Sequence, residues 1–272
     1  MTSHVPRLDI GGLFTQRSLI AQLTEREVVG RYRGSFLGLL WPFITPLLML
    51  LLYTFVFGSV LGGRHWAGAG DGSIGQFALI IFVGLTLHGV LAEMLTQCPK
   101  LIRQNRNYVK KVVFPLEILP VVTLGGALFH AFISFIILLV AQLAMSGQLP
   151  LTSILLPVVL APFALFALGM GWFLTSLGVF IRDIDQILRP ATAALLFLSP
   201  VFYPLSRLPD PWRHLLYLNP LTFIVEQSRA VLIWGEMPDW SGLALYSMIA
   251  FVFAALGFWW FQRTRRGFAD VL

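Results

Sequence analysis

Six long apolar runs dominate the chain and decide what it can fold into. They are rich in Leu, Ile, Val, Phe and Ala, carry almost no charge, and occupy residues 36–61, 74–96, 116–146, 151–180, 187–204 and 241–262. A helix crosses a bilayer with roughly 20 apolar residues, and the run that ends at Pro204 is at the short limit. Strands of a membrane barrel would alternate over about 10 residues, and no such alternation is visible. The sequence predicts an all-α integral membrane protein with six transmembrane helices.

Composition excludes a soluble monomer. Hydrophobic residues make up 57% of the 272 residues and charged residues only 12%. That charged share is about half of what an ordinary soluble domain carries. Six spans joined by short loops leave no room for a large domain outside the bilayer. We therefore expect a single membrane domain over residues 1–272, with a retained N-terminus, because the first 35 residues lack the apolar core of a signal peptide.

The lysines and arginines are distributed unevenly between the two sides of the predicted bundle. With six spans, fifteen of the 19 fall in the N-terminal arm, the 99–117 loop, the 181–190 loop and the C-terminal tail. The other side holds four, which are Arg64, Arg207, Arg213 and Arg229. Basic loops stay in the cytoplasm, so both termini are predicted to be cytoplasmic. The net charge of +6 is then a topology signal and does not indicate a nucleic-acid partner.

Residues 12–31 fit neither a span nor a plain loop. Leu13, Ile20, Leu23 and Val28 recur at helical spacing, and polar side chains interrupt their face. A helix of this kind is typical of the membrane surface. The pattern favours an interfacial helix on the cytoplasmic side, and a solvated arm is the alternative.

Residues 205–235 form a second irregular segment, on the external side. Prolines divide it into two pieces, 211–218 and 220–233, each too short to cross a bilayer. Asn219 followed by Pro220 is a helix start, with Asn as the cap and Pro at the first helical position. Both pieces are too apolar for water, so we expect a re-entrant helical hairpin, with a surface-lying amphipathic pair as the alternative.

The sequence gives little support for a catalytic site or a metal site in this chain. No GxxxxGK[ST] phosphate loop is present, so this chain is not expected to hydrolyse ATP by itself. His88 and His130 are isolated on apolar runs, and Cys98 is the single cysteine, which excludes an intrachain disulfide. Asp183 and Asp185 spell a DxD pattern, but they more plausibly start a helix and pair with Arg182 or Arg189. We expect neither a metal site nor a cofactor in this chain.

An acid and a set of aromatic side chains lie within the apolar runs. Glu93 is an acid at depth, and such residues are functional candidates unless they lie close enough to the interface to be solvated. Aromatic residues make up 14% of the chain. An aromatic face would suit a long sugar polymer that must slide without sticking, whereas single rings are more often packing or belt residues. The candidates on the first and fifth runs are Phe36, Trp41, Phe43, Tyr53, Phe197, Phe202 and Tyr203.

Five segments then occur in an order that resembles a known family. They are RYRGSFLGLLWPFITPL (31–47), NRNYVKKVVFPLEILPVV (105–122), GVFIRDIDQILRP (178–190), SPVFYPLSRLP (199–209) and LNPLTFIVEQSR (218–229). Together they resemble the membrane subunit of polysaccharide-exporting ABC transporters, the O-antigen and capsule permeases of the ABC type 2 superfamily. The resemblance implies a homodimer with two ATPase subunits that bind ATP and Mg, moving a lipid-linked polysaccharide across the bacterial inner membrane.

The resemblance also implies roles for the irregular segments. An N-terminal interface helix, a coupling helix in 99–112 and gate helices in 205–235 are implied. We expect the ATPase to bind Arg103, Arg106, Tyr108 and Lys110, and the lipid pyrophosphate to meet Arg31 and Arg33. Arg182 and Asp183 would form a cytoplasmic elbow. The external gate would comprise Trp212, Asn219, Pro220, Glu226 and Arg229.

Three alternatives remain open on the sequence alone. The polymer could be capsular or of the teichoic-acid type rather than an O-antigen. A permease for a small drug or lipid would share the superfamily but need no pore wide enough for a polymer. A membrane-bound glycosyltransferase would need acids and a sizeable loop, and Asp183 and Asp185 are all that this chain offers.

Overall fold

The computed structural model describes residues 16–56, 74–107, 114–205 and 208–271, and these residues form helices and turns without strands. Five helices are long and apolar enough to cross a bilayer: Gly38–Val56, Gly75–Gln104, Ile118–Ser146, Leu151–Phe180 and Trp240–Gly267. Their limits agree with five of the six predicted runs. The all-helical membrane class is therefore confirmed, with five candidate spans in the described part of the chain.

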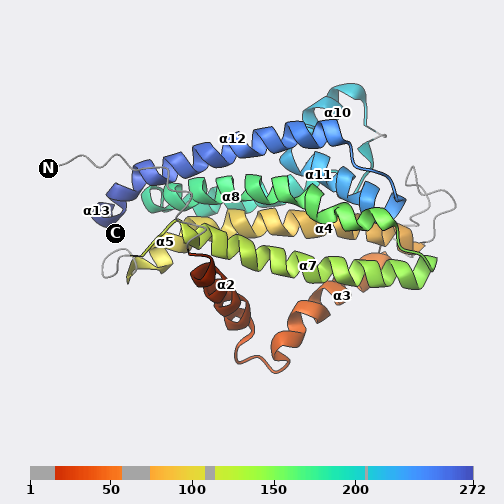
Figure 1. Ribbon diagram of the computed structural model, residues 1–272, viewed down its shortest axis with the longest axis horizontal. Helices are drawn as coiled ribbons and strands as arrows, with labels where there is room; N and C mark the ends of the chain where they lie inside the picture. Colours follow the sequence, from red (N-terminus) through yellow and green to blue (C-terminus); the bar gives the residue numbers. More distant parts are fainter. Residues whose placement is uncertain (1–15, 57–73, 108–113, 206–207, 272) are drawn as a thin grey trace.

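Four of these spans form the packed bundle in Figure 1. The bundle consists of α4 (Ile74–Gln97), α7 (Ile118–Ser146), α8 (Leu156–Phe180) and α12 (Trp240–Thr264). Most of α4 is buried, whereas α3 (Trp41–Tyr53), which runs obliquely beside α4 and α7, has only Pro42 and Leu50 buried. Glycines allow α8 and α12 to approach closely, since a Cβ on Gly257 would collide with the backbone of Gly169. Small residues at such contacts are typical of helix packing in membranes.

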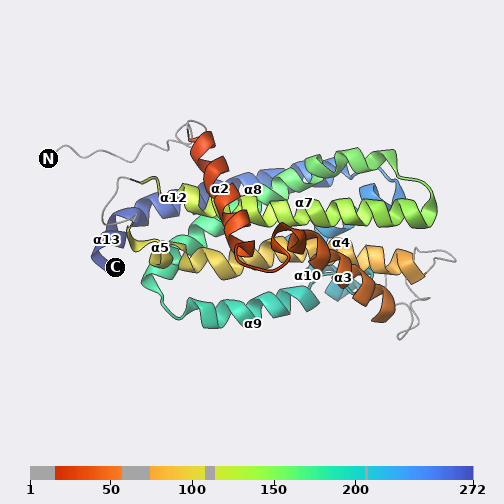
Figure 2. The ribbon, with the colours of Figure 1, turned by 90° about the horizontal axis from the view of Figure 1, so that it is seen from below.

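The fifth predicted run is not one continuous helix, which corrects the expectation for residues 187–204. Helix α9 covers Ile184–Phe197, only 14 residues, and turns follow it. At 1.5 Å per residue this helix is about 21 Å long, shorter than the roughly 30 Å hydrocarbon core. Pro200 lies in the turn that ends the run, where a proline cannot extend the helix. Figure 2 shows α9 along one edge of the bundle, beside α4.

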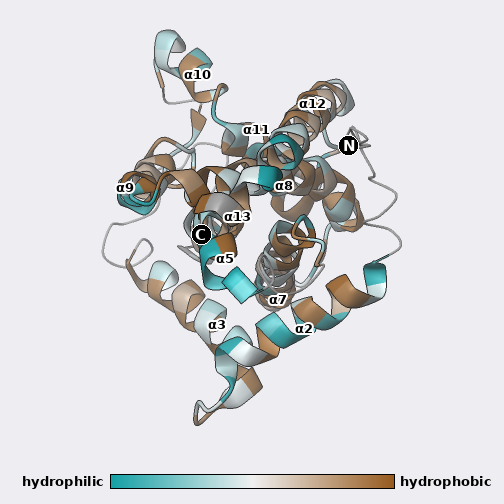
Figure 3. Cartoon of the chain, turned by 90° about the vertical axis from the view of Figure 1, so that its left-hand side faces the viewer, coloured by the Kyte–Doolittle hydropathy of each residue, from teal (hydrophilic) through white to brown (hydrophobic). Residues whose placement is uncertain are grey.

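The N-terminal segment is helical where it is described, as α2 (Arg17–Tyr32). It crosses the bundle obliquely. In Figure 1, α2 and α3 together form a V below the bundle. Helix α2 packs against α7, and Val28 is its only fully buried residue. Seen along the bundle in Figure 3, α2, α3, α9 and α10 occupy the periphery, around the packed helices.

The 205–235 segment divides where the sequence predicts. Helix α10 covers Asp210–Leu216, and α11 covers Pro220–Arg229 and continues as a π-helical turn, η6 (Ala230–Trp234). The Asn219 side chain accepts a hydrogen bond from the Leu221 N–H at 2.9 Å, which confirms the predicted cap. Helix α11 packs against α4 and α8, and six of its ten residues are buried. This packing does not fit a pair of helices lying on the surface.

The short elements complete the two ends of the bundle. At the end that α2 crosses, α4 continues through η3 (Cys98–Lys100) and α5 (Leu101–Gln104), and α12 continues through η7 (Arg265–Gly267) and α13 (Phe268–Val271). At the other end, η4 (Leu151–Leu155) leads into α8. A further turn, η1 (Gly38–Leu40), precedes α3.

Candidate functional site

The aromatic candidates of the first run do not share one face. Phe36 and Phe43 are exposed, whereas Trp41 is half-buried. Tyr53 faces a cavity of about 310 Å³ between α3, α4 and α7, which also reaches Glu93 and His130. Of the four predicted stacking residues of this run, only Phe36 and Phe43 are therefore exposed.

The aromatic candidates of the fifth run come together at the end of α9. The ring centroids of Phe197 and Phe202 are 5.9 Å apart, and the Tyr203 hydroxyl donates to the Phe197 carbonyl at 2.9 Å. Asn219 ties this turn to α11, because its Nδ2 donates to the Leu198 carbonyl at 3.1 Å and to the Ser199 hydroxyl at 2.9 Å. The start of α11 and the end of α9 thus form one connected unit.

Arg229, a predicted gate residue, is fully buried and joins three segments. Its Nε donates to the Ile80 carbonyl of α4 at 3.1 Å, and one terminal nitrogen donates to the Val201 carbonyl at 3.0 Å. The other terminal nitrogen lies 2.8 Å from the Glu226 carboxylate. Trp212, in contrast, stands on the exposed surface of α10. The gate candidates therefore divide into a buried anchor on α11 and an exposed helix.

A group of polar side chains attaches α2 to the bundle, and we call it the α2 polar cluster. Arg31 is paired with Glu93 of α4 and lies 3.7 Å from Glu27. Tyr32 and His130 of α7 share a hydrogen bond of 2.9 Å between Oη and Nε2, and His130 Nδ1 lies 3.9 Å from Glu93. Arg31 is thus paired within the protein although its side chain is 37% exposed, and Arg33 is exposed directly after α2.

Burial changes the pKa of Glu27 on α2. Desolvation raises the pKa of Glu27, and the nearby Arg31 guanidinium opposes that rise. On α4, the His88 Nε2 lies 3.0 Å from the Thr192 carbonyl of α9, within hydrogen-bond distance. Both histidines are satisfied within the packed helices, as the sequence predicts.

Arg103, a predicted coupling residue, contacts the predicted elbow. It donates to the Arg182 carbonyl at 3.2 Å and lies 3.4 Å from the Asp185 carboxylate. Asp185 therefore pairs with Arg103, which corrects the expected pairing with Arg182 or Arg189. Asp183 precedes α9 as predicted for a helix start. Arg106 is exposed, and Tyr108 and Lys110 lie outside the described residues.

Comparison with known proteins places these features in a family. A model of the ABC-2 type transporter family matches residues 18–233. The chain is 30% identical to the O-antigen export system permease protein RfbA of Myxococcus xanthus, over 95% of this chain and 96% of the relative. A protein of the same name from Klebsiella pneumoniae is 23% identical over 98% of both chains. The polysialic acid transport protein KpsM of Escherichia coli is 24% identical, over 90% and 93%.

Sequence reasoning missed the partners of Arg31 and Arg229. One signal was available for the first of them, because Glu93 stands out as an acid within an apolar run. Glu27 and Arg31 are also spaced four residues apart, as in helix ion pairs. That spacing does not show which helix supplies the partner of Arg31.

Proposed function

Because the chain belongs to the ABC-2 type transporter family, we propose that it is the permease subunit of an ATP-driven exporter that moves lipid-linked polysaccharide to the external side of the inner membrane. The observation that carries this proposal is the full-length likeness to O-antigen export permeases. The 30% identity to RfbA of Myxococcus xanthus, against 24% to KpsM, favours an O-antigen-like polymer over a capsular one.

The same likeness supports a division of labour with a second subunit. We propose that two copies of this chain assemble with two ATPase subunits, which bind ATP and Mg. This chain then has no enzymatic role. Arg106, exposed beyond α5, and Arg103, linked to the start of α9, are suited to pass ATPase movement to α9. Tyr108 and Lys110, which follow in the sequence, are proposed to take part in the same ATPase contact.

The polymer path follows from the exposed apolar helices. Exposed apolar side chains cover α3, including Phe43, and α9, including Phe197. In a homodimer these faces would line a shared pore, with Trp41, Tyr53, Phe202 and Tyr203 at its edges and the α10–α11 unit as gate. Arg33 is available for the lipid pyrophosphate, and Arg31 can add only N–H groups that Glu93 leaves unused.

Gene replacement tests this function. A strain lacking the gene should lose surface polysaccharide and retain lipid-linked polymer inside the cell, and the wild-type chain should restore export. Surface polymer is measured by immunoblotting of intact cells, and retained polymer after lysis. Unchanged surface polymer in the deletion strain would contradict the proposal, and loss of a small-molecule resistance instead would favour the drug-permease alternative.

Topology gives a further prediction, since we propose that α9 and its following turn form a sixth crossing. Cysteines placed at Gln148 and Met237 should react with an impermeant maleimide in spheroplasts, and those at Arg106 and Arg266 only after lysis. The native Cys98 is fully buried, so background labelling should be low. If α9 does not cross, Met237 becomes cytoplasmic and Arg266 external, and the labelling pattern of these two positions reverses.

A further inference from the structure

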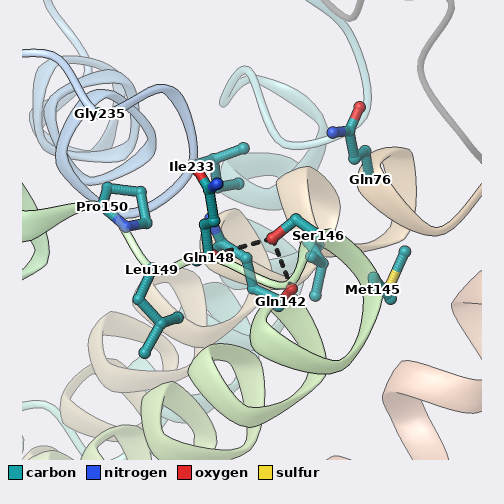
Figure 4. A pocket seen from close by; sticks show the side chains of 10 residues that line it. Gln76, Gln142, Met145, Ser146, Gln148, Leu149, Pro150, Ile233 and Gly235 are labelled. Atoms are coloured by element: carbon teal, nitrogen blue, oxygen red, sulfur yellow. Dashed lines mark hydrogen bonds between the residues drawn. The ribbon is translucent and has the colours of Figure 1, made fainter.

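A polar pocket of about 350 Å³ opens at the end of the bundle opposite α2. It lies between the start of α4, the end of α7, the turn after α7 and η6, as Figure 4 shows. Three glutamines, Gln76, Gln142 and Gln148, line it together with Ser146. In the proposed topology this is the external end of the protein.

Gln142 is the reason to regard this pocket as a binding site. Its side chain lines the pocket, is only 6% exposed, and lies on an apolar helix. Its Oε1 is fully buried, and no hydrogen-bond donor among the described residues pairs with it. A buried amide oxygen without a partner is costly, so native structures keep one where something else supplies the donor.

The wall of the pocket is fixed before anything binds. Ser146 Oγ lies 2.7 Å from the Gln142 carbonyl and 2.9 Å from the Gln148 carbonyl, which holds the turn against the end of α7 (Figure 4). Gly147 between them has a φ of 71°, a left-handed conformation that favours glycine. This arrangement places the exposed Gln148 amide at the rim, across from Gln76.

The lining indicates the chemistry of the bound group. Among the residues that the structure describes, no charged side chain lines the pocket, so these residues offer no counter-charge to a phosphate or a sugar acid. Each glutamine amide offers two donors and an acceptor, which match hydroxyl groups. Leu149, Pro150 and Ile233 supply an apolar wall for the C–H face of a ring. The volume is at the lower end of the range for small-ligand pockets.

We propose that the Gln76–Gln142–Gln148 pocket binds one neutral sugar residue of the exported polymer at the external face. This inference rests on the proposed function, because it takes the polysaccharide as the source of the sugar. It goes beyond that function by giving the chain a sugar contact outside the aromatic pore.

Saturation-transfer NMR on the purified full transporter complex tests the site. The probes are methyl α-glucoside, methyl α-mannoside and methyl α-galactoside, with methyl glucuronoside as the charged comparison. At least one neutral glycoside should receive saturation, and Gln142→Met, which preserves side-chain length, should weaken that binding about tenfold. Gln76→Met and Gln148→Met, at exposed positions, should weaken binding without affecting folding. Gln22→Met on α2 is the matched control and should bind as the wild type does.

Three outcomes would overturn the inference. They are no saturation of any neutral glycoside, equal saturation in the wild type and all three pocket variants, and stronger saturation of the glucuronoside. The gene-replacement experiment detects a failure of the proposed function separately. In that case the wild-type chain would not restore surface polymer in the deletion strain. A chain that restores export but shows none of the glycoside binding refutes the sugar pocket alone.

Discussion

Replacing Arg229 by methionine should destabilise the protein by about 1–3 kcal/mol, the usual cost of leaving a buried polar group without its partner. The guanidinium is fully buried and holds the Ile80 carbonyl, the Val201 carbonyl and the Glu226 carboxylate in place. Methionine fills the volume but donates to none of them. The turn after α9 would then lose the bond from Val201 to α11 and keep those that Asn219 makes to Leu198 and Ser199.

Thermal melting of the detergent-extracted protein measures this loss. Arg189→Met, the same change at an exposed position on α9, is the matched control and should melt within experimental error of the wild type. Arg229→Lys keeps the charge with fewer donors and should fall between wild type and methionine. A melting temperature of Arg229→Met equal to that of the Arg189 control would show that the buried guanidinium does not hold these segments together.

Much of the fold could be predicted because a lipid environment sets the length and composition of a span. The predicted runs 116–146 and 151–180 end at the same residues as the helical spans Ile118–Ser146 and Leu151–Phe180. The break between α10 and α11 was also predictable, since Asn219 and Pro220 form a local helix-start signal. These features depend on residues that are close together in the sequence.

The contacts of the candidate site were less predictable because they join distant residues. Arg31 and Glu93 are 62 positions apart, and Arg229 and the Ile80 carbonyl 149 apart. Neither pairing leaves a periodic pattern, and each depends on which helix packs against which. The fifth run was predicted too long for a similar reason, since its end is decided by the turn that packs Val201 against Gly84 of α4.

The α2 polar cluster leads to the second large expected effect. Helix α2 packs against α7 with one fully buried apolar residue, Val28, and the Arg31–Glu93 pair and the Tyr32–His130 hydrogen bond add polar contacts to α4 and α7. Thr24 also rests on Gly125, where a Cβ would lie 2.8 Å from the Thr24 methyl group. A helix attached mainly by polar contacts can be released by changing one charge.

We expect Glu93→Gln to shift the balance between attached and released α2 about tenfold toward release and to lower polymer export, while ATP hydrolysis continues. Glutamine preserves the shape but removes the charge, and a hydrogen bond to a charged group contributes about 1.5 kcal/mol at the lower end of its range. The lower end applies because the Arg31 side chain is 37% exposed. A change of that size corresponds to about tenfold in the balance between attached and released α2.

Attachment of α2 is measured directly with Thr24→Cys. In the wild-type background this cysteine faces Gly125 and should react slowly with a water-soluble maleimide, whereas Glu93→Gln should raise the labelling rate about tenfold. Glu25→Gln, the same change on the exposed side of α2, should leave both labelling and export as in the wild type.

Exchanging the charges, with Arg31→Glu and Glu93→Arg together, should restore slow labelling and part of the export. Slow labelling in Glu93→Gln would mean that the ion pair does not hold α2, and fast labelling with normal export would mean that α2 can leave the bundle without uncoupling transport.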